Sequence, residues 1–224
     1  MPNPPRYLLS RLKATELAKS SALPSDEGKT LAACVVIPCL PEAENIEALA
    51  EVLQQRAGQP FRTLIVDDDL GQGPAGLLNL AFRQTKEPLF AYLAQDAFPG
   101  RQWLARGIKT LIDKKAGLLA FNDGKWAGQI AAFGLVRRDW CTRVYGGKSL
   151  FFSGYRQHYG DAELSLIARQ HKSYAYDPDA VVMEVDFEKD GRSVDANDRA
   201  LFAQRKLTGF DGRVSDTQLL GLLG

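Results

Sequence analysis

The sequence predicts an α/β fold with a mostly parallel sheet flanked by helices. Short apolar runs typical of buried strands alternate with longer segments whose apolar residues recur at helical spacing. Polar residues, several of them acidic, follow three of these runs directly. Strands that alternate with helices of this length indicate a parallel sheet covered on both faces. The polar residues at the strand ends indicate a ligand site at that edge of the sheet.

The first half of the chain carries the clearest alternation. Three short apolar runs predict buried strands at residues 34–38, 61–66 and 89–94. After each run, apolar residues repeat every three or four positions, which predicts helices at 42–56, 74–85 and 102–114. This order is typical of strand–helix–strand units in a parallel sheet.

The second half is less regular. Apolar runs and a turn at 122–124 predict strands at 117–121, 129–136, 173–176 and 180–185. Helical spacing predicts helices at 137–144, 160–171 and 195–206. The segment 145–157 is rich in Gly, Ser and aromatic residues and is expected to be a loop.

Composition sets few limits on function. Lys and Arg total 28 and Asp and Glu total 27, so net charge does not demand a nucleic acid or an anionic membrane as partner, although a nucleic-acid acceptor is left open. Three cysteines, an odd number, favour a reducing compartment over a disulfide framework. No run approaches the roughly 20 apolar residues that span a bilayer. We therefore expect a cytoplasmic protein with no membrane span.

Polar groups close three consecutive predicted strands. Pro38 and Glu42 follow the first, the aspartates 67–69 follow the second, and Gln95 with Asp96 follows the third. Because the carboxyl ends of parallel strands share one edge of the sheet, these groups are expected at one crevice. Such an arrangement suits a nucleotide whose phosphates are held through a metal ion, since Mg²⁺ typically takes one or two carboxylates plus substrate phosphates.

Two other features, a glycine-rich motif and a cysteine, suggest different functions. The residues 71–76 spell GQGPAG, which matches the glycine spacing of a dinucleotide fingerprint. Three aspartates stand between the strand and these glycines, however, and they would repel a pyrophosphate, so a flexible loop is the preferred interpretation. Cys39 lies at the mouth of the expected crevice, but no histidine is near it in sequence, which disfavours a thiol nucleophile.

Four segments resemble, in order and in spacing, the GT-A nucleotide-diphospho-sugar transferases, especially the family-two glycosyltransferases. Together they cover residues 34 to 185. The segments read VVIPCLPEAENI from Val35, IVDDD from Ile65, YLAQDAFPGRQWL from Tyr92 and GDAELSLIARQHKSYAYDPDAVV from Gly160. The resemblance implies a GT-A fold, that is, a Rossmann-like and mostly parallel sheet flanked by helices, with a small mixed C-terminal part.

The resemblance also implies roles for individual residues. The residues expected to bind the nucleotide are Pro38, Glu42, Asp67, Asp68 and Gln95. Asp96 and Glu184 are the expected ligands of a divalent metal, Mn²⁺ or Mg²⁺, and Asp161 is the expected catalytic base. The alternative for Asp161 is a helix N-cap, a position that Asp also favours. Lys125, Trp126 and the pair 151–152 are candidates for lining an acceptor site.

The sequence departs from the family pattern at several of these positions. Gln95 stands where the family usually has a second acid, and Gly160 replaces the Glu of its Glu-Asp pair. Glu184 corresponds to a position where the family often has a histidine. These departures put the metal site in doubt and keep a second hypothesis open.

We therefore expect a glycosyltransferase that moves a sugar from a nucleotide-diphosphate donor to an acceptor hydroxyl, with inversion and with help from a metal. The expected donor is a UDP-sugar. The alternative is a catalytically weakened relative that binds a nucleotide or a glycan. Within a single GT-A-like domain, we divide the chain into an N-terminal helical extension (1–33), a nucleotide-binding half (34–116) and an acceptor and catalytic half with a C-terminal helix (117–224).

Overall fold

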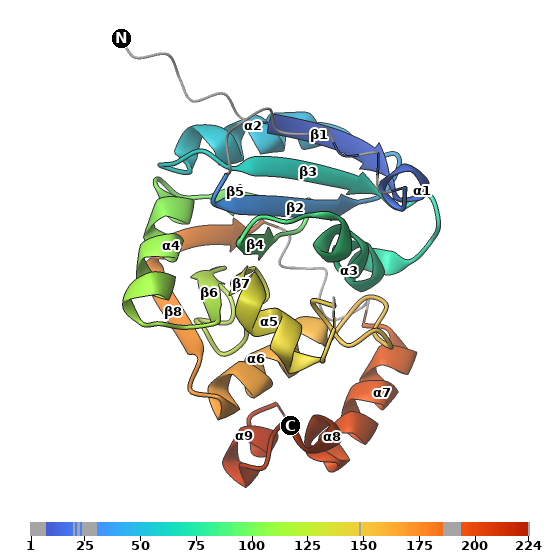
Figure 1. The fold of residues 1–224 in the computed structure, drawn as a ribbon, viewed down its shortest axis with the longest axis vertical. Coiled ribbons are helices and arrows are strands. Elements are labelled where there is room, and N and C mark those ends of the chain that lie inside the picture. Colours follow the sequence, from blue (N-terminus) through green and yellow to red (C-terminus); the bar gives the residue numbers. More distant parts are fainter. Residues whose placement is uncertain are drawn as a thin grey trace.

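A mixed sheet of eight strands, in the order β1-β3-β2-β4-β7-β6-β8-β5, runs through the molecule (Figure 1). The computed structural model describes residues 8–19, 21, 23, 31–147, 149–185 and 194–223. The strands are β1 (Leu8–Lys13), β2 (Ala33–Cys39), β3 (Arg62–Asp67), β4 (Leu89–Tyr92), β5 (Ala97–Pro99), β6 (Leu118–Asn122), β7 (Gly134–Arg137) and β8 (Tyr174–Glu184).

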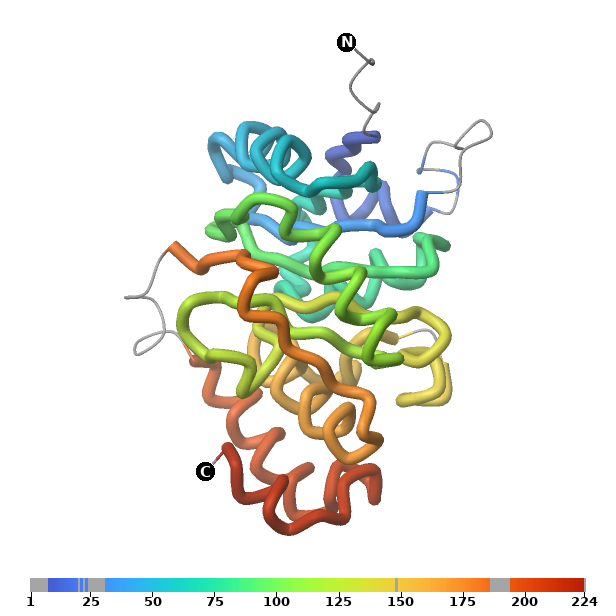
Figure 2. The backbone as a smooth tube through the Cα atoms, turned by 90° about the vertical axis from the view of Figure 1, so that its left-hand side faces the viewer, coloured from blue at the N-terminus to red at the C-terminus, as the bar shows by residue number. Residues whose placement is uncertain are grey.

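Nine helices accompany these strands in the described part of the chain. They are α1 (Ala14–Leu17), α2 (Ile46–Arg56), α3 (Gly73–Gln84), α4 (Trp103–Asp113), α5 (Arg138–Val144), α6 (Gly160–Gln170), α7 (Ala196–Leu207), α8 (Gly209–Gly212) and α9 (Thr217–Gly221). In Figure 2 the C-terminal helices lie at the end of the molecule opposite α2 and β1.

Most strand pairs are parallel, as the sequence predicted. β1, β3, β2 and β4 form a continuous parallel block. β7 runs antiparallel between β4 and β6, while β8 is parallel to β6 and carries the short β5 antiparallel at the edge. The observed α/β architecture confirms the predicted fold class.

Both faces of the sheet are buried, and β2 shows why. Its seven residues are all buried, and their side chains alternate between the two faces. Cys34 and Val36 join a core with residues of α3, α5 and α6, whereas Val35 and Ile37 join a second core with residues of α2 and α4. A strand buried on both faces needs a continuous apolar run, which is what residues 33–37 supply.

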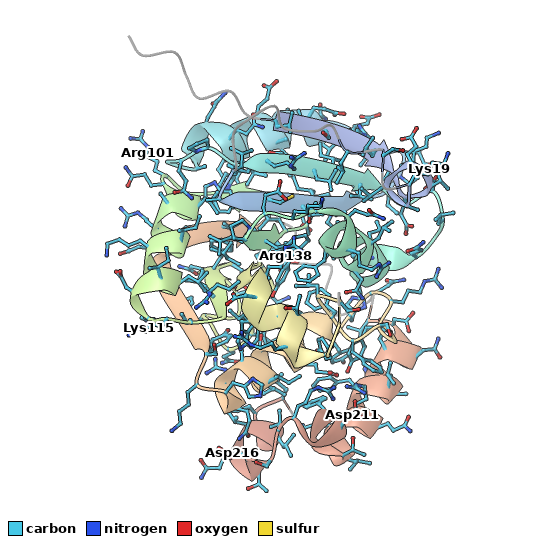
Figure 3. The ribbon with its side chains drawn as sticks, in the orientation of Figure 1. Lys19, Arg101, Lys115, Arg138, Asp211 and Asp216 are labelled. Carbon is cyan, nitrogen blue, oxygen red and sulfur yellow. The ribbon has the colours of Figure 1, made fainter. Side chains whose placement is uncertain are left out.

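Arg138, labelled near the middle of Figure 3, ties the two halves of the chain together. Its guanidinium donates to the carbonyl oxygens of Phe82 at 2.5 Å and Glu87 at 2.8 Å, and to the hydroxyl of Thr85 at 2.8 Å. It also lies over the Phe82 ring, 4.2 Å from its centroid. The first turn of α5 is thereby fixed to the end of α3.

The N-terminal segment corrects one prediction. We expected a helical extension over residues 1–33, but Leu8–Lys13 forms β1, which pairs with β3 at the edge of the sheet, and Ala14–Leu17 is the helical part of the described residues in this segment. The open edge of β3 offers a row of hydrogen-bonding groups that an extended chain can satisfy. Residues 1–7 and 24–30 of the predicted extension lie outside the described residues. The three-segment division itself stays a prediction.

Three predicted strands differ in extent from the observed ones. Of the predicted strand 129–136, only the part from Gly134 onward is a strand. The predicted strands 173–176 and 180–185 are a single strand, β8, which continues through Pro178. Its register against β6 shifts between Ala120 and Asn122, and this irregularity accommodates the proline. No helix in the described part of the chain is long and apolar enough to cross a bilayer.

Candidate functional site

A cavity of about 1140 Å³ opens at the edge of the sheet that the sequence indicated. Its walls come from the segments after β2 and β4, the turn after β6, the first turn of α6, and residues of α7 and the C-terminal end. It brings together six of the eight predicted site residues: Pro38, Asp68, Gln95, Asp96, Asp161 and Glu184. Their roles stay predictions, but their convergence is a fact of the fold.

The other two predicted residues, Glu42 and Asp67, are not part of the cavity wall. Glu42 is exposed in the turn between β2 and α2. The Asp67 carboxylate accepts hydrogen bonds from Arg11 Nε and Nη2 at 3.0 to 3.2 Å, and the Cys39 thiol lies 3.0 Å from it. The nucleotide-binding roles expected for both residues stay predictions, and Asp67 is held by Arg11 of β1.

Each of the three consecutive aspartates has its own structural partner. Asp67 meets Arg11, the oxygens of Asp68 accept the amides of Gln72 and Gly73 at 2.8 Å each, and Asp69 accepts the Thr15 amide at 3.1 Å. Adjacent carboxylates repel each other unless cations or hydrogen-bond donors stabilise them. Here a guanidinium and backbone amides supply that stabilisation.

The arrangement around Asp68 also explains why GQGPAG is not a dinucleotide site. A pyrophosphate would need bare amides at the start of α3. Two of those amides, from Gln72 and Gly73, already donate to the Asp68 carboxylate. Gly73 has a positive φ of 72° and lies against the Arg156 carbonyl, where a Cβ would come within 2.5 Å, so its lack of a side chain is used for close packing.

Asp96 and Glu184 reach the cavity from neighbouring backbone. β5 and β8 are paired with Ala97 opposite Glu184, and the amide of Val185 donates to the Asp96 carbonyl at 3.1 Å. The Gln95 side-chain oxygen accepts from the Leu40 amide at 3.5 Å. The sheet therefore positions two carboxylates and one amide at the same corner of the cavity.

Asp161 lies in the first turn of α6, one residue inside the helix, and Tyr159 occupies the N-cap position. Its side chain is partly buried. Burial raises the pKa of the Asp161 carboxyl to about 6, and the negative charges of Asp123 and Glu184 add to the rise, while backbone amides oppose it. Such a pKa suits a group that exchanges a proton near neutral pH.

The glycine before Asp161 has a packing reason. A Cβ on Gly160 would come within 2.8 Å of the Phe151 ring. Phe151 lines the cavity beside Asp161, and Phe152 is not part of the wall. An acidic side chain at 160, as the resemblance would have it, does not fit together with this ring.

Asp123, which follows β6, has a structural role that no sequence pattern indicated. Its side chain is 1% exposed, and one oxygen accepts the amides of Lys125 at 2.9 Å and Trp126 at 2.8 Å. Its carbonyl accepts the amide of Glu184 at 3.1 Å. Asp followed by Gly is a common turn signal, so only the fold reveals that the residues of this turn, Lys125 and Trp126, enter the cavity wall.

The far side of the cavity is formed by the C-terminal part of the chain, which sequence patterns did not connect with the site. Arg199, Phe202 and Lys206 of α7 line it together with Leu222 and Leu223. The Lys206 ammonium donates to the Leu223 carbonyl at 2.6 Å. The sequence predicted the helix but not that the helix closes a wall.

The Cys39 thiol lines the cavity but is poorly suited to be a nucleophile. Burial, together with the hydrogen bond to Asp67, raises its pKa to about 12. The thiol is therefore protonated at neutral pH. All three cysteines are buried and free.

The residues at the predicted metal site fit a divalent cation poorly. Within the described residues, no three His, Cys, Asp or Glu side chains come together as a metal-binding group. The Lys125 ammonium lies 4.0 Å from Glu184 Oε2, and a divalent ion on that carboxylate would face this positive charge. The metal roles of Asp96 and Glu184 stay predictions.

By sequence, no protein-family model and no curated protein matches the chain. Solved structures do match it. A mannosyltransferase, PcManGT from Pyrobaculum calidifontis, in complex with GDP-Man and Mn²⁺, is 18% identical, with a TM-score of 0.55 over 78% of this chain and 63% of that one. TarS from S. aureus is 12% identical, with a TM-score of 0.59 over 85% of this chain and 42% of that one.

A third structure, residues 1–349 of TarS in complex with UDP-GlcNAc, is 11% identical, with a TM-score of 0.60 over 85% of this chain and 70% of that one. The present chain thus spans less than two thirds of the mannosyltransferase and of the longer TarS chain. At these identities the likeness concerns the fold. The chain has the GT-A fold of nucleotide-sugar transferases, as the four sequence segments indicated.

Proposed function

We propose that the protein is a glycosyltransferase that uses a nucleotide-diphosphate sugar. The observation that carries the proposal is the convergence of Pro38, Asp68, Gln95, Asp96 and Asp161 on one cavity in a GT-A fold. Two matched structures contain nucleotide sugars, GDP-Man in one and UDP-GlcNAc in the other. A UDP-sugar is the preferred donor, and the acceptor carries a hydroxyl group, as in a glycan.

Asp161 is the proposed base. In an inverting transfer, a carboxylate opposite the leaving diphosphate accepts the proton of the acceptor hydroxyl as that oxygen bonds to the sugar carbon. The partly buried Asp161, with a pKa of about 6, is ionised at neutral pH and still basic enough for this task. Trp126 on one side and α7 on the other enclose space for an acceptor.

Ligand-induced stabilisation tests the donor part of the proposal. UDP, GDP, UDP-GlcNAc and GDP-mannose are added separately to the full chain, and the melting temperature is followed. A ligand present at 100 times its Kd stabilises a fold by about 2.7 kcal/mol. The proposal predicts a clear upward shift with at least one nucleotide. No shift with any of them, with or without Mn²⁺, would contradict it.

The alternative is a relative that binds a nucleotide sugar without transferring it. The replacement of the family's acids by Gln95 and Gly160 favours it. Release of free nucleoside diphosphate from the bound donor distinguishes the two, because a transferase releases UDP or GDP when it transfers or hydrolyses the sugar. Binding without any release over a broad panel of hydroxyl-bearing acceptors would favour the alternative.

A further inference from the structure

Lys125 places an ammonium group at the corner of the cavity where the resemblance puts a metal. Its Nζ lies 4.0 Å from Glu184 Oε2, and Lys125, Glu184 and Asp96 all line the cavity. The side chains of Lys125 and Glu184 are only 23% and 16% exposed. In such partly buried surroundings, a positive charge acts on a neighbouring anion more strongly than it does in water.

The turn that carries Lys125 is held in place from both ends. The buried Asp123 carboxylate accepts the amides of Lys125 and Trp126, and the Asp123 carbonyl accepts the amide of Glu184. The Lys125 ammonium also lies 5.2 Å from the centroid of the Trp126 ring. The position of the ammonium group is therefore set by the β6 turn and β8 together, as preorganised electrostatic stabilisation requires.

The charges around Lys125 also favour the binding of an anionic group by this lysine. Gln95 is neutral where the resemblance implies an acid, so the corner holds one negative charge fewer than the family pattern has. A lysine ammonium is a compact point charge with three donors, and it binds phosphate well. Glu184 serves as its counter-ion in the absence of a ligand.

We infer that Lys125 binds the diphosphate of the donor directly and supplies the positive charge that the resemblance assigns to a metal. This inference rests on the proposed function, since it names the group that holds the donor of that same site. As the bond between the sugar and the diphosphate breaks, the electron pair stays on the phosphate oxygen. Lys125 stabilises the charge that develops there.

Titration calorimetry with UDP and with GDP tests the inference on the full chain, once with EDTA and once with Mg²⁺ or Mn²⁺. The wild type is expected to bind in EDTA with a Kd within about threefold of that in metal. Lys125→Met keeps an apolar stem without the charge and should weaken binding in EDTA by roughly 10- to 100-fold, the usual effect of losing a charged hydrogen bond. Lys125→Arg should recover most of that loss.

Lys109→Met is the matched control, because Lys109 is exposed on α4, pairs with Asp113 and is not part of the cavity wall. Its affinity should equal that of the wild type. Binding that EDTA abolishes in the wild type and that Lys125→Met leaves unchanged would overturn the inference while the proposed function stands. No binding of UDP or GDP under either condition would overturn both. Equal melting temperatures for Lys125→Met and Lys125→Arg establish that folding is not the cause.

Discussion

Arg205 donates two hydrogen bonds to the carboxylate of Glu163, from Nε at 2.8 Å and from Nη2 at 2.7 Å. The Glu163 side chain is fully buried and that of Arg205 is 7% exposed. Tyr145 and Tyr155 donate their hydroxyls to the same carboxylate. The pair joins α7 to α6, the helix that carries Asp161, and so it fixes the wall of the cavity relative to the proposed base.

Arg205→Met should therefore destabilise the fold strongly. The substitution leaves a buried carboxylate without its cation, which typically costs about 3–5 kcal/mol. Urea denaturation followed by circular dichroism measures the change. The double variant Glu163→Gln with Arg205→Met should recover part of the loss, because glutamine is neutral and still accepts from the tyrosine hydroxyls.

Arg137→Met provides the matched control for this pair. Arg137 forms an ion pair with Asp139 at 2.7 Å, but the two side chains are 39% and 54% exposed. Exposed pairs of this kind contribute about 0–1 kcal/mol. If Arg205→Met lowers the free energy of unfolding as little as Arg137→Met does, the buried pair does not anchor α7.

Asp161→Asn should abolish transfer while leaving donor affinity nearly unchanged. The amide keeps the size of the side chain but cannot take up the acceptor's proton, and a positioned base contributes roughly 10²- to 10⁴-fold in rate. Two quantities are measured for the wild type and the variant: the rate of sugar transfer from the donor that binds best, and the Kd of that donor. Asp113→Asn, on the exposed face of α4, is the control. Full activity of Asp161→Asn would remove this residue from the mechanism.

The raised pKa of Asp161 predicts two opposite pH trends. Activity should fall as pH drops below about 6, because the protonated carboxyl cannot act as a base. The folded state holds this proton more tightly than the unfolded chain does, so the contribution of Asp161 to stability decreases as pH rises from about 4 to about 6. A rate–pH profile and the stability of wild type and Asp161→Asn at pH 4 and pH 7.5 measure both trends.

Asp161→Asn should accordingly be at least as stable as the wild type at pH 7.5, with the difference shrinking toward pH 4. The asparagine has no charge to bury and so escapes the cost that the ionised carboxylate bears. The opposite result is that Asp161→Asn is less stable than the wild type at pH 7.5 and that this deficit disappears at pH 4. It would show that the fold stabilises the charged carboxylate.

Local patterns of the sequence were sufficient to predict the central strands and the helices that follow them. β2 is a continuous apolar run, β3 is apolar from Leu64 to Val66, and the helices after them have a clear apolar face. The prediction for Leu8–Lys13 was wrong because six residues with three leucines fit a short helix or an edge strand equally well. Only the vacant edge of β3, far away in sequence, decides for a strand.

Some residues of the candidate site could likewise be placed from the sequence, and others could not. Residues at strand ends, such as Pro38 and Asp96, could be placed at the cavity because strand direction fixes them. Asp67 ends the same kind of strand, yet Arg11 of the unexpected β1 holds it elsewhere. Arg199 and Lys206 reach the cavity from a C-terminal helix, and the position of that helix depends on tertiary packing that no local pattern encodes.

Asp68 allows its structural role and its predicted nucleotide-binding role to be separated. Asp68 lines the cavity, its two oxygens each accept one amide at the start of α3, and each oxygen has a second lone pair for another donor. Asp68→Ala removes the anchors of α3 and should cost roughly 0.5–2 kcal/mol, as for loss of a helix cap. Asp68→Asn keeps one acceptor and should retain more of that stability. Both variants should bind UDP more weakly than the wild type if the carboxylate contacts the ribose, and calorimetry measures this. A UDP Kd for Asp68→Asn equal to that of the wild type would limit Asp68 to holding the first turn of α3.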